Sequence, residues 1–145
     1  MTGFAQIGEA KLRAVVTEFY ERVFRDVMIG FMFEGKDKQR LIDKEYELVA
    51  ALLGADIKYT GRPMRSAHAA HTIFGGHFER RMQLLRNVFA DLDVPAEVAK
   101  TWLDHAESLR SQITKDRGSE CGATAETGLR QVPEPTDGPI KLGRR

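Results

Sequence analysis

The sequence predicts an all-α fold, and three observations lead to this prediction. Four long segments repeat apolar residues at three- and four-residue spacing, which is the period of a helix with one buried face. No segment alternates apolar and polar residues between turn signals, so strands are not expected. A chain of 145 residues is long enough to form one domain with a substantial core.

The first predicted helix runs from Glu9 to about Arg25. Its apolar stripe contains Leu12, Val15, Val16, Phe19, Tyr20, Val23 and Phe24. An apolar corner from Met28 to Gly35 follows, and it is too short to form a core helix of its own.

The second predicted helix runs from about Asp37 to Leu53. Its inner side contains Leu41, Ile42, Leu48, Val49, Leu52 and Leu53. Gly54 is expected to end it, because glycine adopts the left-handed conformation common just past a helix end. Residues Ala55 to Pro63 read as a loop, and a brief helix from Met64 carries His68.

The third predicted helix spans roughly Gly76 to Leu92. Its inner residues are Phe78, Met82, Leu85, Val88, Phe89 and Leu92. The fourth begins at Pro95, whose missing N–H costs nothing in a first turn, and continues to about Lys115. Its inner residues are Val98, Trp102, Ala106, Leu109 and Ile113.

Residues 1–115 are therefore expected to form the folded domain, and residues 116–145 a disordered tail. The tail has no aromatic residue and is rich in glycine and proline. Such a segment cannot bury enough apolar surface to offset the entropy lost on ordering. We expect its removal to leave the helical core intact.

The composition narrows the class of partner. With 22 Lys and Arg residues against 21 Asp and Glu, the formal charge is +1, which favours neither nucleic acid nor a membrane as partner. The longest apolar run, Leu48 to Leu53, is too short to span a bilayer. The first residues do not resemble a secretory signal, so a cytoplasmic location is expected. The single cysteine, Cys121, excludes an internal disulfide, and there is no Cys-x-x-Cys-His motif for covalent haem attachment.

His68 is the first candidate for binding chemistry. It follows a turn-rich loop that starts at Tyr59, and it lies on a short helix just after Met64. An imidazole on a helix next to an apolar helix can hold a flat apolar cofactor by its metal. A purely structural histidine would fit the same position. Zinc is a further alternative, with His71 and His77 as additional ligands, although no carboxylate or cysteine completes the set.

Several landmarks along the chain together match a known family. They are Phe4-Ala-Gln-Ile7-Gly8, Phe19-Tyr20-Glu-Arg22-Val23, Phe31-Met32-Phe33-Glu-Gly35, Tyr59-Thr-Gly61-Arg62-Pro-Met64, His68 and His77-Phe78. Over about residues 3 to 115, the chain resembles a truncated (two-over-two) haemoglobin, nearest to group 1. One departure is Gly8-Glu9, where the family often has two glycines. The resemblance implies two antiparallel helix pairs that form a two-over-two helical sandwich around haem b.

The resemblance also assigns roles to individual residues. It makes His68 the axial ligand of the iron, with its other ring nitrogen able to donate to a nearby backbone carbonyl. Tyr20 would lie on the distal side and donate to bound O₂, and Phe33 would pack on the haem face. Further haem contacts are expected from Phe19, Met32, Leu41, Tyr59, Met64, Ile73 and Phe78. His77 is expected to be structural at a helix start, and His105 to be an ordinary helix residue.

The second predicted helix carries the main departures from the family pattern. Glu45 stands where group 1 members often have glutamine. A protonated Glu45 could donate to a bound ligand, whereas pairing with Lys44 or Arg22 would leave it only able to accept. Lys44 and Arg40 are candidates for binding the haem propionates, and a solvated helix face is the alternative for both.

The function implied by the resemblance is reversible binding of O₂, and also of NO and CO, at five-coordinate haem iron, as in oxygen transport. A globin of this kind can also detoxify NO by converting it to nitrate, with an external reductase restoring ferrous iron. One alternative is a six-coordinate haem protein for redox or gas sensing, with Lys44 as sixth ligand. Another is an interaction module without haem, against which His68 and Tyr20 argue. The expected state is a monomer or weak dimer.

Overall fold

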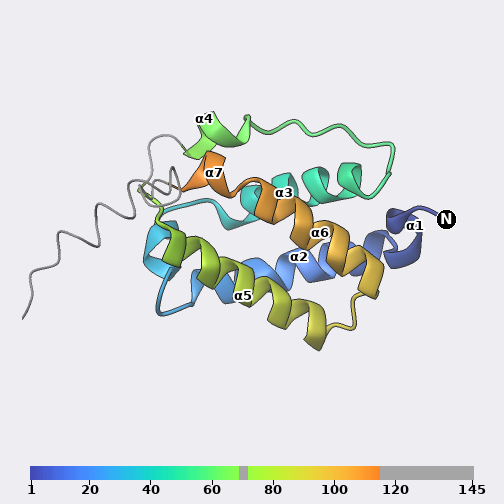
Figure 1. Ribbon diagram of the computed structural model, residues 1–145, viewed down its shortest axis with the longest axis horizontal. Helices are drawn as coiled ribbons and strands as arrows, with labels where there is room; N and C mark the ends of the chain where they lie inside the picture. Colours follow the sequence, from blue (N-terminus) through green and yellow to red (C-terminus); the bar gives the residue numbers. More distant parts are fainter. Residues whose placement is uncertain (69–71, 115–145) are drawn as a thin grey trace, which may run out of the picture. The chain divides into compact units, whose positions relative to one another are not determined.

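The computed structural model describes residues 1–68 and 72–114, and within these ranges the regular structure is helical with no strand (Figure 1). The elements are α1 (Gly3–Ile7), α2 (Glu9–Phe24), the 3₁₀ helix η1 (Gly30–Phe33), α3 (Lys38–Leu52), α4 (Met64–His68), α5 (Gly75–Asp91), α6 (Ala96–Ser108) and α7 (Arg110–Ile113). All of them belong to one compact unit, Met1–Lys115. The expected tail, residues 116–145, lies outside the described residues.

Local signals set the ends of the two helices nearest the predicted site. α2 starts after Gly8, whose φ of +84° suits glycine, and α3 starts where the Asp37 carboxylate accepts the Arg40 N–H at 3.1 Å. Gly54, with φ +100°, follows the end of α3 as the sequence predicts. α2 packs against both α3 and α5, so it lies at the centre of the domain.

The predicted fourth helix is wrong in one respect, because it is divided at Leu109 into α6 and α7. The Ser108 hydroxyl donates to the carbonyl of His105 at 2.6 Å, and the Leu109 N–H donates to the carbonyl of Ala106 at 3.1 Å. Both bonds join residues three apart, whereas a regular α-helical bond joins residues four apart. The last turn of α6 is therefore tighter than the rest of the helix. The break lets α7 lie against α4, the helix that carries His68 (Figure 1).

The main core joins α2, α3, α5 and α6 around fully buried side chains. The largest of these include Trp102, Phe19, Leu12 and Leu85. The Trp102 and Phe89 rings lie 4.8 Å apart. On α3 the buried face is Ile42, Tyr46, Val49 and Ala50, whereas Leu48 and Leu52, expected inside, are only partly buried.

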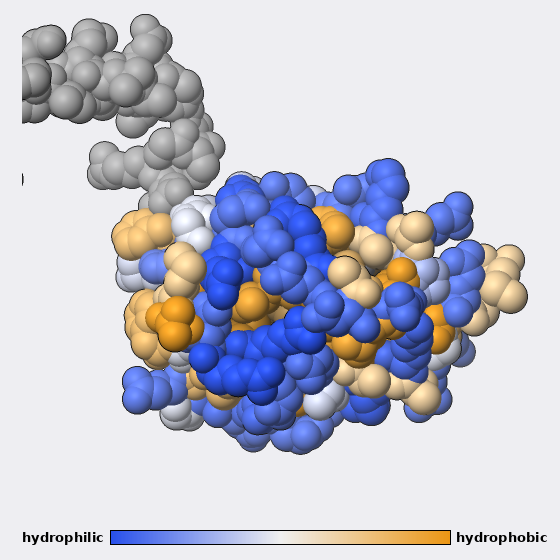
Figure 2. Space-filling view, turned by 90° about the horizontal axis from the view of Figure 1, so that it is seen from below, coloured by the Kyte–Doolittle hydropathy of each residue, from blue (hydrophilic) through white to orange (hydrophobic). Residues whose placement is uncertain are grey.

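The surface is dominated by charged and polar side chains, with apolar areas between them on the face shown in Figure 2. Within the described ranges, no helix combines the length and the apolar composition needed to cross a bilayer.

A partly buried ion pair links the corner after α2 to α5. The Asp26 side chain is only 4% exposed, and its carboxylate accepts three bonds from the Arg80 guanidinium, the shortest at 2.6 Å. It also accepts the backbone N–H groups of Met28 and Ile29 at 3.0 and 3.1 Å. The bonds from Arg80, followed by those from the backbone, hold the pKa of Asp26 below its usual range, although burial opposes them.

Asp26→Asn is therefore expected to destabilise the domain by about 2 kcal/mol at pH 7, since it weakens hydrogen bonds to a charged, buried acceptor. Because the pKa of Asp26 is lowered by folding, this stabilisation is present above the unfolded-state pKa of about 4. It is lost as the pH falls through the folded-state pKa. Urea unfolding of both proteins between pH 7 and pH 3 should show the difference shrinking at low pH.

Asp104→Asn is the matched control, because Asp104 pairs with Lys100 on the surface with a side chain that is 66% exposed. Exposed pairs of this kind contribute little. Equal stabilities of the Asp26 and Asp104 variants at pH 7 would contradict the structural role of Asp26.

Candidate functional site

His68 is held by a hydrogen bond that defines its tautomer. It is the last residue of α4, and its Nδ1 lies 2.8 Å from the carbonyl oxygen of Met64. A carbonyl only accepts, so Nδ1 carries the ring proton and the lone pair lies on Nε2. A neutral imidazole in this tautomer is suited to bind iron through Nε2. The residue thus fits the axial role that the sequence predicts for it.

Three polar side chains converge from three different helices. The Arg81 guanidinium of α5 lies 3.4 Å from the Glu45 carboxylate of α3, and the two side chains are 24% and 12% exposed. Tyr20 of α2 lies beside both, since burial and then the charge of Glu45 raise the pKa of its phenol, whereas the charge of Arg81 lowers it. We call Tyr20, Glu45 and Arg81 the polar triad.

Burial and charge keep the polar triad in a defined state. Burial, then the negative charge of Glu45, raises the pKa of Tyr20 well above its usual range, so the phenol stays protonated near neutral pH. Burial acts to lower the pKa of Arg81, but Glu45 and Tyr20 outweigh it and raise the pKa. The triad therefore combines a cation, a neutral phenol and a carboxylate.

Aromatic rings surround the phenol. The ring centroids of Phe19, Phe24 and Phe33 lie 5.1, 6.5 and 6.5 Å from that of Tyr20, all in edge-on arrangements. The Arg81 guanidinium lies 4.9 Å from the centre of the Phe19 ring, a cation–π distance. Phe19 is fully buried, so these contacts restrict how far the triad can move.

The partner of Glu45 differs from both partners considered from the sequence. Arg22 instead pairs with Glu18 at 2.8 Å and Asp91 at 2.9 Å. The Lys44 ammonium donates to the Thr60 hydroxyl at 2.5 Å and lies 3.6 Å from Glu47. Pairing of Glu45 with Lys44 or Arg22 is thus wrong, because packing of α5 brings Arg81 to it from 36 residues away.

Arg81 is absent from the site residues that the sequence predicts. The signal that identifies it is its spacing, three residues after Phe78 and four before Leu85, on the buried stripe of α5. A charged residue on such a stripe needs partners, and the polar triad supplies them.

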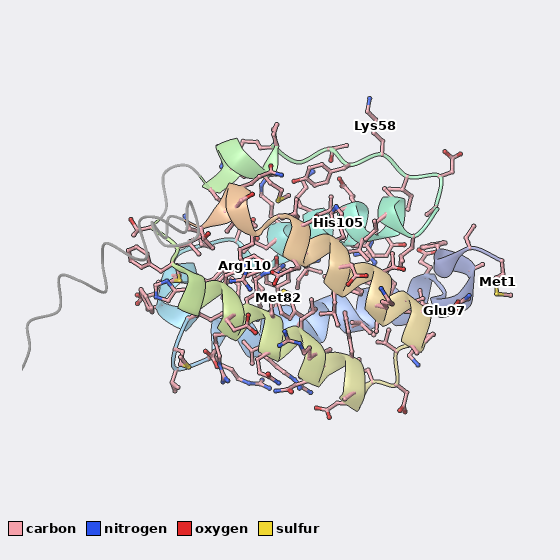
Figure 3. The ribbon with its side chains drawn as sticks, viewed as in Figure 1. Met1, Lys58, Met82, Glu97, His105 and Arg110 are labelled. Carbon is pink, nitrogen blue, oxygen red and sulfur yellow. The ribbon has the colours of Figure 1, made fainter. Side chains whose placement is uncertain are left out.

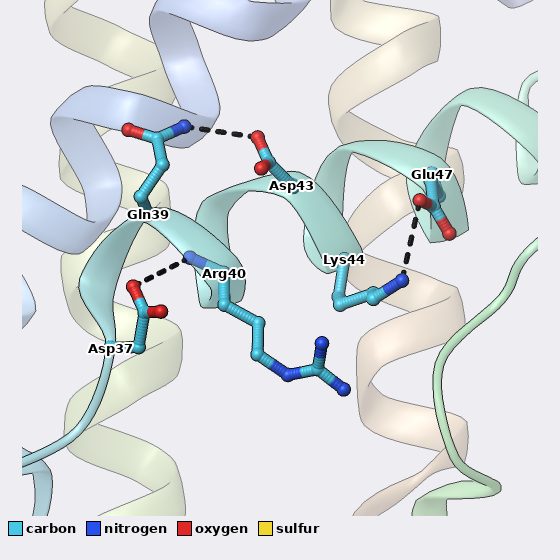
Figure 4. A pocket seen from close by; sticks show the side chains of 6 residues that line it. All are labelled: Asp37, Gln39, Arg40, Asp43, Lys44 and Glu47. Carbon is cyan, nitrogen blue, oxygen red and sulfur yellow. Dashed lines mark hydrogen bonds and ion pairs between the residues drawn. The ribbon is translucent and has the colours of Figure 1, made fainter.

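The exposed side of α3 forms a hollow of about 330 Å³ lined by Asp37, Gln39, Arg40, Asp43, Lys44 and Glu47 (Figure 4). Arg40 and Lys44 extend to the same side of the helix. In the loop before α4, the Tyr59 hydroxyl donates to the carbonyl of Arg62 at 2.9 Å. A side chain at position 61 would collide with the Tyr59 ring. Glycine at 61 lets this loop fold closely.

The other predicted haem contacts lie on or next to η1, α3, α4 and α5. Phe78 is 2% exposed and packs with Met82 and Ala106, while the Arg110 guanidinium lies 4.6 Å from its ring (Met82 and Arg110 are marked in Figure 3). Partly buried positions are occupied by Met32, Leu41, Met64 and Ile73.

The remaining histidines show no metal cluster where they are described. The Nδ1 of His77 accepts the Phe74 N–H at 3.2 Å at the start of α5, which is the structural role expected for it. His105 lies on α6. His71, part of the zinc alternative, lies outside the described residues. In the part that is described, no group of three His, Cys, Asp or Glu side chains is placed to hold a metal ion.

A helical domain that carries a histidine on a short helix, held by a backbone carbonyl, and a buried tyrosine on a central helix is typical of a globin. The family model described as a bacterial-like globin matches residues 2–115, and the chain belongs to this family. It is 33% identical over 106 residues to the group 1 truncated haemoglobin GlbN of Mycolicibacterium paratuberculosis, covering 73% of this chain and 78% of that protein. GlbN of Nostoc commune is 26% identical, with 73% and 90% covered. The predicted resemblance to group 1 is confirmed.

Solved structures confirm the two-over-two fold. The Fe(III) form of a truncated haemoglobin from Tetrahymena pyriformis superposes with a TM-score of 0.73 at 23% identity, over 80% of this chain and all of that one. The oxygen-avid truncated haemoglobin of Bacillus subtilis gives 0.70 at 21%, over 79% and 100%. Globins bind haem through its iron, so haem is the cofactor of this family.

Proposed function

We propose that this chain binds haem b through His68 and reversibly binds O₂, and also NO and CO, on the opposite side of a five-coordinate iron. The observation that carries the proposal is the bond between His68 Nδ1 and the carbonyl of Met64, 2.8 Å long. It presents Nε2 as the ligating atom and fixes the ring orientation. Haem supplies the iron that binds the gas, and the chain supplies its surroundings.

On the gas-binding side, the polar triad and Phe33 would border the ligand. Hydrogen-bond donors from Tyr20 or Arg81 would stabilise a ligand that takes up negative charge, such as O₂, more than CO. The surrounding rings of Phe19 and Phe33 exclude water from this region.

The charged groups on α3 suit the propionate edge of haem. Arg40 offers a planar guanidinium for a carboxylate, and Lys44 adds a second positive charge beside it. Leu41, Tyr59, Met64, Ile73 and Phe78 would contact the apolar part of the macrocycle.

The position of Lys44 favours five-coordinate over six-coordinate iron. Its ammonium bonds to Thr60 on the loop before α4 and lies near Glu47, rather than joining the polar triad. A role as sixth ligand would require both interactions to be broken, and Lys44 is therefore assigned to the propionate edge.

We extend the proposal to NO detoxification. In the presence of O₂, one NO would be converted to one nitrate, leaving ferric haem that an external reductase returns to the ferrous state with one electron. The donors of the polar triad would retain O₂ long enough for NO to arrive.

Absorption spectra of the purified full chain with haem test the proposal. We expect a Soret band, a high-spin five-coordinate spectrum in the ferrous state, and reversible changes on adding and removing O₂ or CO. Failure to bind haem stoichiometrically would overturn it, and so would a low-spin six-coordinate ferrous spectrum.

A further inference from the structure

Tyr20 has one proton to donate, and the Glu45 side chain is a competing acceptor for it. Burial and then the negative charge of Glu45 raise the pKa of the phenol, whereas the positive charge of Arg81 lowers it, so both groups lie beside Tyr20. A carboxylate is a stronger acceptor than a diatomic gas ligand, because it carries a full negative charge. A ligand on the distal side therefore competes with Glu45 for this proton.

The Arg81 guanidinium has more hydrogen-bond donors than its bond to Glu45 uses. A guanidinium carries five N–H groups in a fixed plane, and the bond to Glu45 does not use them all. The side chain is 24% exposed, so part of it is reachable by a small ligand. The central carbon of the Arg81 guanidinium lies 4.9 Å from the centroid of the Phe19 ring, and its Nη2 lies 3.4 Å from the Glu45 carboxylate. Arg81 is thus both oriented and able to donate further.

We propose that Arg81, rather than Tyr20, is the main hydrogen-bond donor to the gas ligand, and that Glu45 positions Arg81 while retaining the proton of Tyr20. This inference rests on the proposed function and names the residue that determines the ligand preference of that site. It follows that ligands with negative charge on their outer atom, O₂ above CO, are held by a cation rather than by a phenol.

The rate of O₂ release from the ferrous protein distinguishes the two donors. Arg81→Met should speed release roughly 10- to 100-fold, the range for loss of a bond from a charged donor. Tyr20→Phe should change the rate by less than about threefold, because its proton is held by Glu45. Arg86→Met is the matched control on the same helix, since Arg86 pairs with Glu79 at the surface, and it should change nothing.

A double-mutant comparison tests the role of Glu45. In a Glu45→Leu background the proton of Tyr20 is released, so Tyr20→Phe should then speed O₂ release at least about tenfold. The same small effect of Tyr20→Phe in both backgrounds would contradict the retention of its proton by Glu45.

The C–O stretching frequency of the ferrous CO complex gives a readout that does not depend on rates. A cation near the outer atom of CO draws electron density into it and weakens the C–O bond. Arg81→Met should therefore raise this frequency, while Tyr20→Phe and Arg86→Met should leave it unchanged.

Arg81→Met leaves Glu45 without its cation and could impair folding, so two further variants are needed. Arg81→Lys keeps the charge, and Arg81→Met with Glu45→Leu removes both charges together. Each should retain the Soret band, and Arg81→Lys, which keeps a cation beside the ligand, should raise the C–O frequency less than Arg81→Met does. A protein that binds haem and O₂ but releases O₂ fast only in Tyr20→Phe would overturn this inference alone. A protein without a Soret band would instead overturn the proposed function.

Discussion

His68→Ala is expected to lower the affinity for haem by more than about 100-fold, because loss of even an outer partner of a metal ligand costs about 10- to 100-fold. The variant keeps the apolar contacts and the cations of α3 but loses the iron–imidazole bond. Titration of the haem-free protein with haem, followed at the Soret band, measures the effect. Added imidazole should restore part of the binding, since it can occupy the space left by the side chain.

His105→Ala is the control, because His105 lies on α6 and not on the short helix α4 that carries His68. It should bind haem as the original chain does, and we expect the same of His71→Ala. Loss of the Soret band in either of these variants, with retention in His68→Ala, would show that another histidine is the ligand.

Trp102→Ala is expected to destabilise the domain by about 3–5 kcal/mol, the range for removing a large buried aromatic side chain. Trp102 is 1% exposed and packs on Phe89, so the change would leave a cavity between α5 and α6. Urea unfolding followed by far-ultraviolet circular dichroism is the suitable measurement, because Trp102 is the only tryptophan.

Lys100→Ala is the matched variant on the same helix, with a side chain that is 78% exposed, and it should change stability by less than about 0.5 kcal/mol. A loss of less than about 1 kcal/mol in Trp102→Ala would contradict the packing of α6 described here.

The sequence predicts a helix correctly where its apolar residues recur at helical spacing. The stripe from Leu12 to Val23 predicts α2, and Gly54 marks the end of α3, because these signals act over a few residues. The break at Leu109 does not follow, since its cause is a side chain-to-backbone bond from Ser108 that competes with the helix. Tyr46 is likewise missing from the predicted inner face of α3, although its position four residues after Ile42 fits that face.

The surroundings of His68 and those of Glu45 can be predicted from the sequence to different degrees. His68 and its backbone partner lie four residues apart, so their bond is a local consequence of a short helix. The partner of Glu45 is not local. The sequence offers Lys44 as the next residue along the chain and Arg22 on the preceding helix, whereas Arg81 reaches Glu45 only through the packing of α5. A contact across 36 residues cannot be read from helical spacing alone.

The resonance Raman spectrum of the ferrous, ligand-free protein tests the central claim most directly, because it detects the bond between iron and imidazole itself. The account predicts an iron–imidazole stretching band with high-spin, five-coordinate marker bands, and loss of that band in His68→Ala. A low-spin, six-coordinate spectrum without this band, or an unchanged band in His68→Ala, would contradict it.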